Sequence, residues 1–290
     1  MDVAYGTARM IAHFFTVDVE EYFQVSAFES IVARSSWHEI ESRLAIGVMR
    51  ILDLLDRHSA TGTFFILGWL AERYPGLVRE IVQGGHEIAS HGWDHKRVTQ
   101  LDPDAFRDEV RRSKDTLEQV VGEPVVGYRA PSYSIIPGRE WALEILVEEG
   151  YRYDSSLFPV RRRGYGYPAA PRDPHWLDTG AGPLYELPPA TLRFVGVNLP
   201  AAGGGYFRLF PYGVVRRALR QAERRSASGI FYIHPWELDP DQPRLDVSLK
   251  TRIRHYTGLR TVQSRLRRLL EEFRFSSVAE QLPAAVPTAA

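Results

Sequence analysis

Short apolar runs alternate with segments of helical periodicity along most of the chain. Apolar runs of a few residues predict buried strands, and apolar positions that recur every three or four residues predict amphipathic helices. The predicted strands cover residues 13–19, 61–67, 86–90, 124–130, 151–153 and 229–235. The predicted helices cover residues 42–58, 75–83, 103–121, 137–150, 212–226 and 257–272. This alternation predicts an α/β fold built from βαβ units around a mainly parallel sheet, open or closed.

Three regions depart from this alternation. Residues 159–184 are rich in Pro, Gly and Arg, which is typical of a long surface loop. Residues 184–200 and 203–211 are typical of strands joined by turns. We expect one domain over residues 12–240, followed by a C-terminal extension, residues 241–290, that packs on it.

The composition excludes several classes of partner and site. Lys plus Arg total 36 and Asp plus Glu total 36, so the charge balance gives no reason to expect nucleic acid or an acidic membrane. There is no cysteine, so a bound metal would need His, Asp, Glu or water as ligands. No apolar run is long enough to predict a transmembrane span, and residues 1–15 lack the pattern of a signal peptide. The expected location is therefore cytoplasmic.

Polar residues follow the predicted strands at the points where those strands end. In parallel α/β folds the carboxyl ends of the strands meet on one face, where functional residues gather. Each residue alone has an ordinary structural explanation: a boundary histidine, a solvated acid, an ion-pair partner or a turn residue. Their joint occurrence favours a site. The residues concerned are Asp18, Glu20, His91, His95, Arg129, Asp154 and His234.

These residue types together support one kind of chemistry. Two imidazoles and one carboxylate are a familiar zinc ligand set that leaves a position open for water. A second carboxylate can remove a proton from that water, and a separate histidine can protonate the leaving group. An arginine beside the base keeps it ionised. The pattern predicts metal-assisted hydrolysis of an amide or an ester.

Five segments in order resemble the polysaccharide deacetylases of the NodB-homology type, which form carbohydrate esterase family four. The segments are "TVDVEEYF", "SHGWDH", "YRAPSYS", "YDSS" and "IHP", and the resemblance covers residues 12–240. The segments "GGGYFR" and "HPWE" are similar to those of a bacterial subgroup associated with exopolysaccharide gene clusters. The resemblance implies a distorted (β/α) barrel with seven strands.

The resemblance also implies a role for each residue. Asp18 would be the general base, oriented by Arg129. His234 would be the general acid, tuned by Asp154. Zn²⁺ or another divalent metal would be held by Glu20, His91 and His95. An oxyanion or substrate site would be formed by Ser132, Tyr133 and Trp236, with a backbone N–H of the Ser132–Tyr133 segment as donor.

Three departures from the family pattern bear on this assignment. The second acid of the first motif stands one residue later and is Glu20, with Glu21 as the alternative ligand. Ser132 precedes Tyr133 and shifts the aromatic residue by one position. Gly92 stands where the family has Ser or Thr, which removes a hydroxyl that would help to order the histidine loop.

Three functions stay open at this level. The first is an N-deacetylase that acts on an N-acetylated glycan precursor in the cytoplasm, in exopolysaccharide biosynthesis. The second is a cyclic-amide hydrolase of the same fold, against which the complete metal set argues. The third is a non-catalytic glycan-binding protein, in which loop aromatics stack on sugar rings. The sugar, its linkage, the native metal and the oligomeric state do not follow from the sequence.

Overall fold

The computed structural model describes residues 11–162 and 164–284. Its main sheet has nine strands, and seven of them run in the order β10-β1-β2-β3-β4-β5-β7 with parallel pairing throughout. β6 adds to β7 in antiparallel fashion, and β11 pairs with β1. The strands of this sheet are β1 (Ala12–Val19), β2 (Thr63–Ile66), β3 (Glu87–Ser90), β4 (Gly127–Tyr128), β5 (Tyr153–Asp154), β6 (His175–Thr179), β7 (Gly182–Glu186), β10 (Ile230–Ile233) and β11 (Arg274–Ser276).

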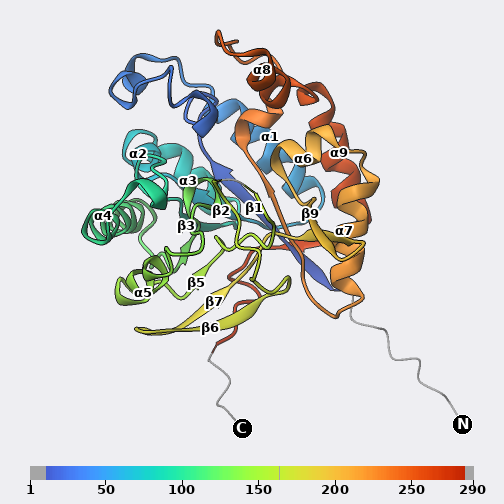
Figure 1. The fold of residues 1–290 in the computed structure, drawn as a ribbon. Coiled ribbons are helices and arrows are strands. Elements are labelled where there is room, and N and C mark those ends of the chain that lie inside the picture. Colours follow the sequence, from blue (N-terminus) through green and yellow to red (C-terminus); the bar gives the residue numbers. More distant parts are fainter. Residues whose placement is uncertain (1–10, 163, 285–290) are drawn as a thin grey trace, which may run out of the picture.

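The chain that follows β7 returns to the other edge of the parallel series. Pro189 forms a parallel bridge with Ile230 of β10, and the Ala190 N–H donates to the Ile230 carbonyl at 3.0 Å. The sheet therefore curls toward a barrel, with helices around it (Figure 1). The predicted α/β class with a parallel sheet is confirmed, whereas the predicted count of seven strands is not.

Local sequence signals explain where the helices begin and end. Asp102 caps α4 by accepting a hydrogen bond from the Ala105 N–H at 2.9 Å, and Pro103 occupies the first turn, where no N–H is needed. Gly122 ends α4 at φ +78°, a conformation that favours glycine. The helices are α1 (Leu44–Arg57), α2 (Gly68–Arg73), α3 (Pro75–Gln83), α4 (Pro103–Val121), α5 (Trp141–Glu148), α6 (Gly204–Leu209), α7 (Gly213–Glu223), α8 (Leu249–Tyr256) and α9 (Leu259–Glu272).

Two segments differ from the sequence prediction. β6 and the start of β7 lie inside residues 159–184, which were predicted as a loop; β6 is a half-exposed edge strand without a long apolar run. Residues 203–211 were predicted as strand but contain α6, whose six residues are too few to show a helical period. Phe207 of α6 packs on Phe231 of β10, with ring centroids 5.0 Å apart, so tertiary burial decides the conformation.

A close helix contact fixes the segment that follows β10. This segment is the short 3₁₀ helix η5 (Pro235–Leu238). A Cβ atom at Gly47 of α1 would lie 2.0 Å from the Pro235 carbonyl oxygen, so only glycine allows this approach. α1 therefore packs directly against the backbone that follows His234.

The described part of the C-terminal extension packs on the same sheet. β11 pairs with β1, and the Val278 N–H donates to Thr63 Oγ1 at 2.8 Å. Residues 285–290, the end of the predicted extension, lie outside the described residues, and the boundary at residue 240 stays a prediction. Within the described ranges, the helices are too short or too polar to cross a membrane.

Candidate active site

The carboxyl ends of β1, β3, β4 and β10 bring the predicted residues together. Asp18 lies at the end of β1, and Glu20 follows it. His91 comes directly after β3, and His234 directly after β10. Because the strands are parallel, these ends meet on one face of the barrel.

Asp18 and Arg129 form a buried ion pair. Arg129 Nη1 donates to Asp18 Oδ1 at 2.6 Å and to Thr16 Oγ1 at 2.9 Å. Ser155 accepts two further hydrogen bonds from the guanidinium, through its carbonyl and its hydroxyl. Arg129 is fully buried and its guanidinium carbon lies 4.1 Å from the centre of the Phe65 ring. The ion pair holds the Asp18 carboxylate in one orientation.

Glu20, His91 and His95 converge as a candidate metal site. One ligand atom from each lies within 4.8 Å of the others, and all three side chains are buried. Glu20 Oε2 lies 2.8 Å from His95 Nε2, yet it has no hydrogen-bond partner among the described residues. A buried carboxylate oxygen beside two imidazoles suits a divalent cation, and this donor set is typical of zinc.

The groups around these three residues hold them in a ligand geometry. His91 Nδ1 lies 2.8 Å from the Arg129 carbonyl oxygen, so Nε2 is left to face the site. The Trp236 indole N–H donates to Glu20 Oε1 at 3.1 Å. Burial lowers the pKa of His91 to about 4, which favours the neutral imidazole that binds metal. The residues present therefore fit a metal site.

The choice between the two adjacent glutamates is clear in the structure. Glu21 accepts hydrogen bonds from the Ser42 hydroxyl and the Arg43 N–H, so its carboxylate is engaged away from the histidines. Burial raises the pKa of Glu21. For Glu20, burial opposes ionisation, but His95 and then His234 and His91 outweigh it and lower the pKa to about 2.

Gly92 is explained by its backbone conformation. Its φ is +77°, in the left-handed region, while a Cβ atom at this position would have room. The loop is ordered without a side chain at this position: the Ser113 hydroxyl donates to the Gly92 carbonyl at 2.9 Å, and Ser90 Oγ accepts from the Gly92 N–H at 3.3 Å. Two serines on neighbouring elements thus order the histidine loop.

His234 is held by the carboxylate of Glu237, to which the sequence pattern gave no role. His234 Nδ1 lies 2.7 Å from Glu237 Oε1, and the His234 N–H donates to the same oxygen. The Nε2 atom lies 3.6 Å from Glu20 and 3.8 Å from Asp18. Burial disfavours protonation, but Glu237, Glu20 and Asp18 outweigh it and raise the pKa of His234 to about 9.

Glu237 is in turn held by the C-terminal part of the chain. Arg208 of α6 donates through Nε to Glu237 Oε2 at 2.5 Å. The other guanidinium nitrogens donate to the carbonyls of Arg254, His255 and Thr257 at the end of α8. His255 also stacks on Trp236, with ring centroids 4.2 Å apart, and Trp236 stacks on His234. Glu237 follows His234 by three residues directly after an apolar strand, and this spacing is the sequence signal that indicates the His234–Glu237 contact.

Asp154 does not contact His234, which corrects the tuning role implied for it. Its carboxylate accepts from the Ser156 hydroxyl at 2.5 Å, and Ser156 Oγ accepts from the Ala130 N–H at 2.8 Å. Asp154 is also the register partner of Glu186 on β7. Burial and the neighbouring Asp154 raise the pKa of Glu186 well above its usual range. Asp154 therefore supports the backbone next to Arg129.

The Ser132–Tyr133 segment differs in detail from the predicted oxyanion site. The Tyr133 N–H donates to the Ala130 carbonyl at 3.0 Å and is therefore not free. Both residues have positive φ, 56° and 53°, which is strained for side chains of this size. The Tyr133 hydroxyl is buried and has no hydrogen-bond partner among the described residues. This segment offers the Ser132 N–H and the Tyr133 hydroxyl as donors.

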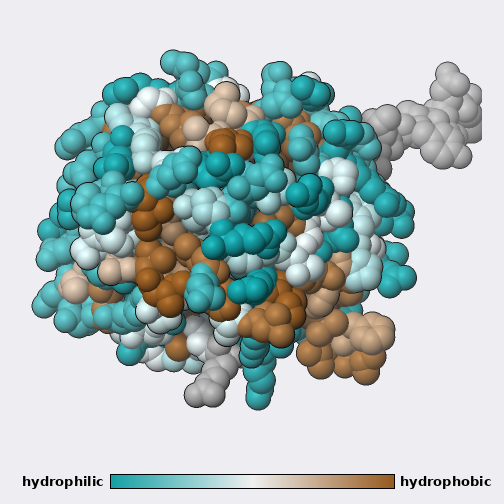
Figure 2. Space-filling view, turned by 90° about the horizontal axis from the view of Figure 1, so that it is seen from above, coloured by the Kyte–Doolittle hydropathy of each residue, from teal (hydrophilic) through white to brown (hydrophobic). Residues whose placement is uncertain are grey.

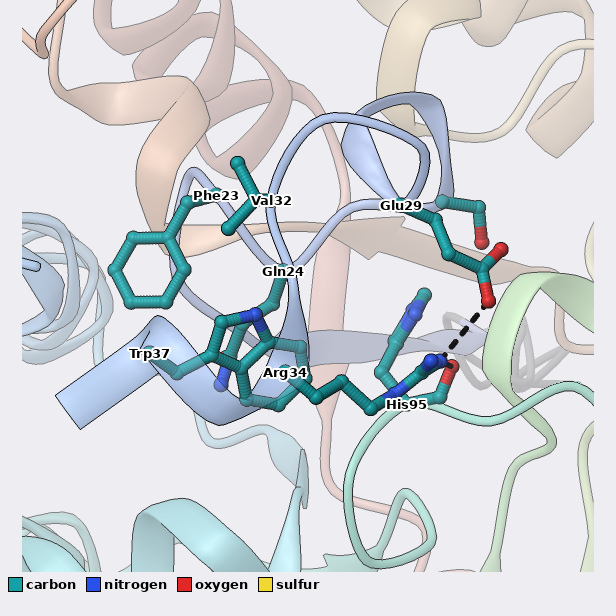
Figure 3. Close-up of a pocket in the computed structure, with 8 residues that line it drawn as sticks. Phe23, Gln24, Glu29, Val32, Arg34, Trp37 and His95 are labelled. Atoms are coloured by element: carbon teal, nitrogen blue, oxygen red, sulfur yellow. Dashed lines mark hydrogen bonds and ion pairs between the residues drawn. The ribbon is translucent and has the colours of Figure 1, made fainter.

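The loop between β1 and α1 covers the histidine segment from outside. Arg34 donates to the Asp94 carbonyl at 2.9 Å and pairs with Glu29 at 3.1 Å, the contact drawn dashed in Figure 3. A small pocket beside His95 lies between this loop and the metal residues (Figure 3). Its lining also includes Phe23, Gln24, Ser26, Val32 and Trp37.

Two family models match successive parts of the chain and leave the residues before 46, which include Asp18 and Glu20, outside both matches. Residues 46–153 match the family model described as polysaccharide deacetylase. Residues 155–283 match a domain of unknown function, DUF3473. The two matches meet near Asp154, inside the sheet, so His234 and Glu237 belong to the second match while His91, His95 and Arg129 belong to the first.

Curated relatives are similar to part of the chain. A peptidoglycan deacetylase-like protein of Gibberella zeae is 38% identical over 114 residues, which are 39% of this chain and 33% of that protein. A peptidoglycan-N-acetylglucosamine deacetylase of Bacillus cereus is 31% identical over 96 residues, 33% of this chain and 35% of that protein. The chain thus spans about a third of the length of the curated relatives it matches.

Solved structures share the fold over nearly the whole chain. A Mycobacterium smegmatis protein described as a polysaccharide deacetylase superimposes with a TM-score of 0.57 at 22% identity, covering 97% of this chain and 96% of that one. A family 4 carbohydrate esterase from Streptomyces lividans, in complex with acetate, gives 0.50 at 14% identity, covering 96% and 98%. The family match and the curated relatives show that part of the chain, including residues 46–153, is similar to polysaccharide deacetylases, and the solved structures show a shared fold.

Proposed function

We propose that this protein is a metal-dependent hydrolase that removes N-acetyl groups from an N-acetylated polysaccharide or oligosaccharide precursor. One observation carries the proposal: a buried, arginine-held carboxylate, a two-histidine and one-carboxylate ligand set, and a carboxylate-held histidine meet at one end of the barrel. Metal-assisted amide hydrolysis needs these three parts together.

The residues divide the reaction between base and acid. Asp18 accepts a proton from water as the water oxygen bonds to the acetyl carbonyl carbon. Arg129 holds the Asp18 carboxylate in a fixed orientation through the 2.6 Å contact. The carbon–nitrogen bond then breaks, and His234 gives a proton to the departing amine nitrogen, so that acetate and a free amine result.

Glu20, His91 and His95 would hold the divalent cation, with zinc as the expected metal. When bound, such a cation acts as a Lewis acid on water and on the acetyl oxygen. Ser132 and Tyr133 supply donors for the oxyanion through the Ser132 N–H and the Tyr133 hydroxyl. Trp236 fixes one oxygen of Glu20, at 3.1 Å from its indole nitrogen.

Glu237 is proposed as the residue that positions the acid, in place of Asp154. It touches His234 at 2.7 Å and is itself anchored by Arg208. A histidine whose Nδ1 is fixed by a carboxylate presents Nε2 in a defined direction. Asp154 then supports the Ala130 backbone, next to Arg129, through Ser156.

The biological setting is proposed from the chemistry and the sequence resemblance. A glycan precursor of exopolysaccharide synthesis offers the N-acetyl groups that this site would hydrolyse. The cytoplasmic location and the exopolysaccharide role stay predictions.

The proposal is tested by measuring acetate release from a panel of N-acetylated oligosaccharides, with the metal content of the same preparation determined. Acetate release that rises with zinc content supports the proposal. A protein that carries zinc in full and releases no acetate from any member of the panel would contradict it.

A further inference from the structure

A hairpin outside the catalytic site carries an unusual apolar tip. β8 (Thr191–Phe194) and β9 (Val197–Pro200) form a separate two-stranded sheet, joined by the two-residue turn Val195-Gly196. Phe194 is 65% exposed, Val195 83% and Val197 59%. Figure 2 shows hydrophobic side chains projecting at this edge of the molecule, where β9 lies in Figure 1. The tip therefore presents three large apolar side chains to solvent.

The turn is built at a cost in backbone strain. Val195 and Gly196 have φ of 46° and 75°, as a type I′ turn requires. The first position of such a turn favours Asn, Asp or Gly, because a β-branched side chain is strained at positive φ. Valine is thus a poor choice for the turn and adds only exposed apolar surface. A binding function of the exposed apolar surface explains why valine occupies position 195.

Unpaired positive charge surrounds the hairpin. Asn198 Nδ2 of β9 donates to the Pro159 carbonyl at 2.9 Å, and Arg161 and Arg162 follow Pro159 by two and three residues along the chain. Gln221 of α7 bonds to the backbone of β8, and Arg217 lies one helical turn before it. Four exposed arginines result, none of them in an ion pair within residues 11–162 and 164–284: Arg161, Arg162, Arg193 and Arg217. The acids of this region, Glu223 and Asp173, already pair with Arg220 and Arg225.

We propose that the β8–β9 hairpin attaches the protein to an anionic membrane surface, with Phe194, Val195 and Val197 entering the interface and the surrounding arginines contacting lipid headgroups. A narrow projecting tip suits insertion between headgroups better than a flat protein partner. Basic side chains near such a tip are attracted to anionic lipid. This attachment is independent of the deacetylase activity proposed above.

The test uses the full chain and lipid vesicles. Sedimentation is measured with vesicles of pure phosphatidylcholine and with vesicles in which about one lipid in four is phosphatidylglycerol. The expected result is binding to the anionic vesicles that weakens with salt, and weaker binding to the neutral ones. Absence of binding to anionic vesicles at low salt would overturn the proposal.

Variants separate the tip from general damage. Val195→Asn suits the turn better than valine, so its unfolding midpoint is expected to be unchanged or higher, while vesicle binding falls about tenfold. Arg161→Gln with Arg162→Gln is expected to reduce binding to anionic vesicles alone. Ile31→Asn is the matched control, because Ile31 is 50% exposed in the loop between β1 and α1, and its binding is expected to equal wild type.

Two results would contradict the membrane assignment. One is vesicle binding by Val195→Asn that equals wild type. The other is a wild-type dimer, seen by analytical ultracentrifugation, that Val195→Asn abolishes, because the tip would then serve contact between copies.

Discussion

Replacing Glu237 by Gln tests how the proton donor is positioned. The substitution keeps the shape of the side chain but removes the charge between His234 Nδ1, at 2.7 Å, and Arg208 Nε, at 2.5 Å. The NH₂ group of the new side-chain amide must then face either Arg208, whose guanidinium offers no acceptor, or His234 Nδ1, which loses its carboxylate partner. Glu237 is fully buried, so water cannot replace the lost contact.

The magnitude follows from the kind of contact that is lost. A hydrogen bond to a charged group contributes about 1.5–3 kcal/mol, which corresponds to a loss of roughly 10- to 150-fold in rate if it acts in the transition state. The expected loss in kcat on an N-acetylated oligosaccharide lies in this range. KM and metal content are expected to change little, because Glu237 contacts neither Glu20, His91 nor His95 in the structure.

A second substrate separates acid positioning from general damage. An amine must be protonated as it leaves, whereas para-nitrophenolate leaves without a proton. Hydrolysis of para-nitrophenyl acetate by Glu237→Gln is therefore expected to stay close to wild type. The control is Glu272→Gln, which also removes the charge from an arginine-bound glutamate, at the Arg216 pair, and is expected to leave both activities unchanged.

Two outcomes would refute this reasoning. Full activity of Glu237→Gln on the N-acetylated substrate would show that Glu237 does not position His234. An equal loss on both substrates would point to damage at the metal site or at the attacking water.

Three further predictions concern metal, packing and pH. His95→Ala is expected to lose bound zinc after dialysis, measured by elemental analysis, while wild type keeps it. Gly47→Ala, whose Cβ would meet the Pro235 oxygen at 2.0 Å, is expected to lower the free energy of unfolding by about 1–3 kcal/mol in urea denaturation; an unchanged midpoint would contradict the packing. Burial lowers the pKa of His13 to about 4 and of His255 to about 3. At pH values below the ordinary histidine pKa of about 6.5, the unfolded chain therefore takes up protons that the folded chain does not. Metal-free protein should therefore lose about 1.5 kcal/mol of unfolding free energy per such imidazole between about pH 6.5 and pH 5, and His255→Phe should remove the share of one imidazole from that loss.

The strand-end rule identified the residues that approach the reacting atoms. Asp18, His91 and His234 each follow an apolar strand, and parallel strands bring their carboxyl ends together. The same rule could not say which way a side chain turns. Asp154 also ends a strand, yet it bonds to Ser156 and supports Ala130.

Contacts between distant segments were beyond sequence reasoning. Arg208 reaches Glu237 only because α6 is a helix and α8 ends beside it, and neither element has a clear sequence period. The β6–β7 hairpin was missed for a similar reason, since β6 is a half-exposed edge strand. The backbone conformation at this point was not predictable either: the Tyr133 N–H donates to the Ala130 carbonyl across a turn in which Ser132 has a positive φ of 56°.

The central claim is that Asp18 acts as the base beside a metal held by Glu20, His91 and His95. The most direct measurement is acetate release by Asp18→Asn, with zinc content determined on the same sample. Zinc equal to wild type, with kcat lower by roughly 100-fold or more, is the predicted result. Wild-type acetate release from Asp18→Asn, in particular from protein stripped of metal, would contradict it.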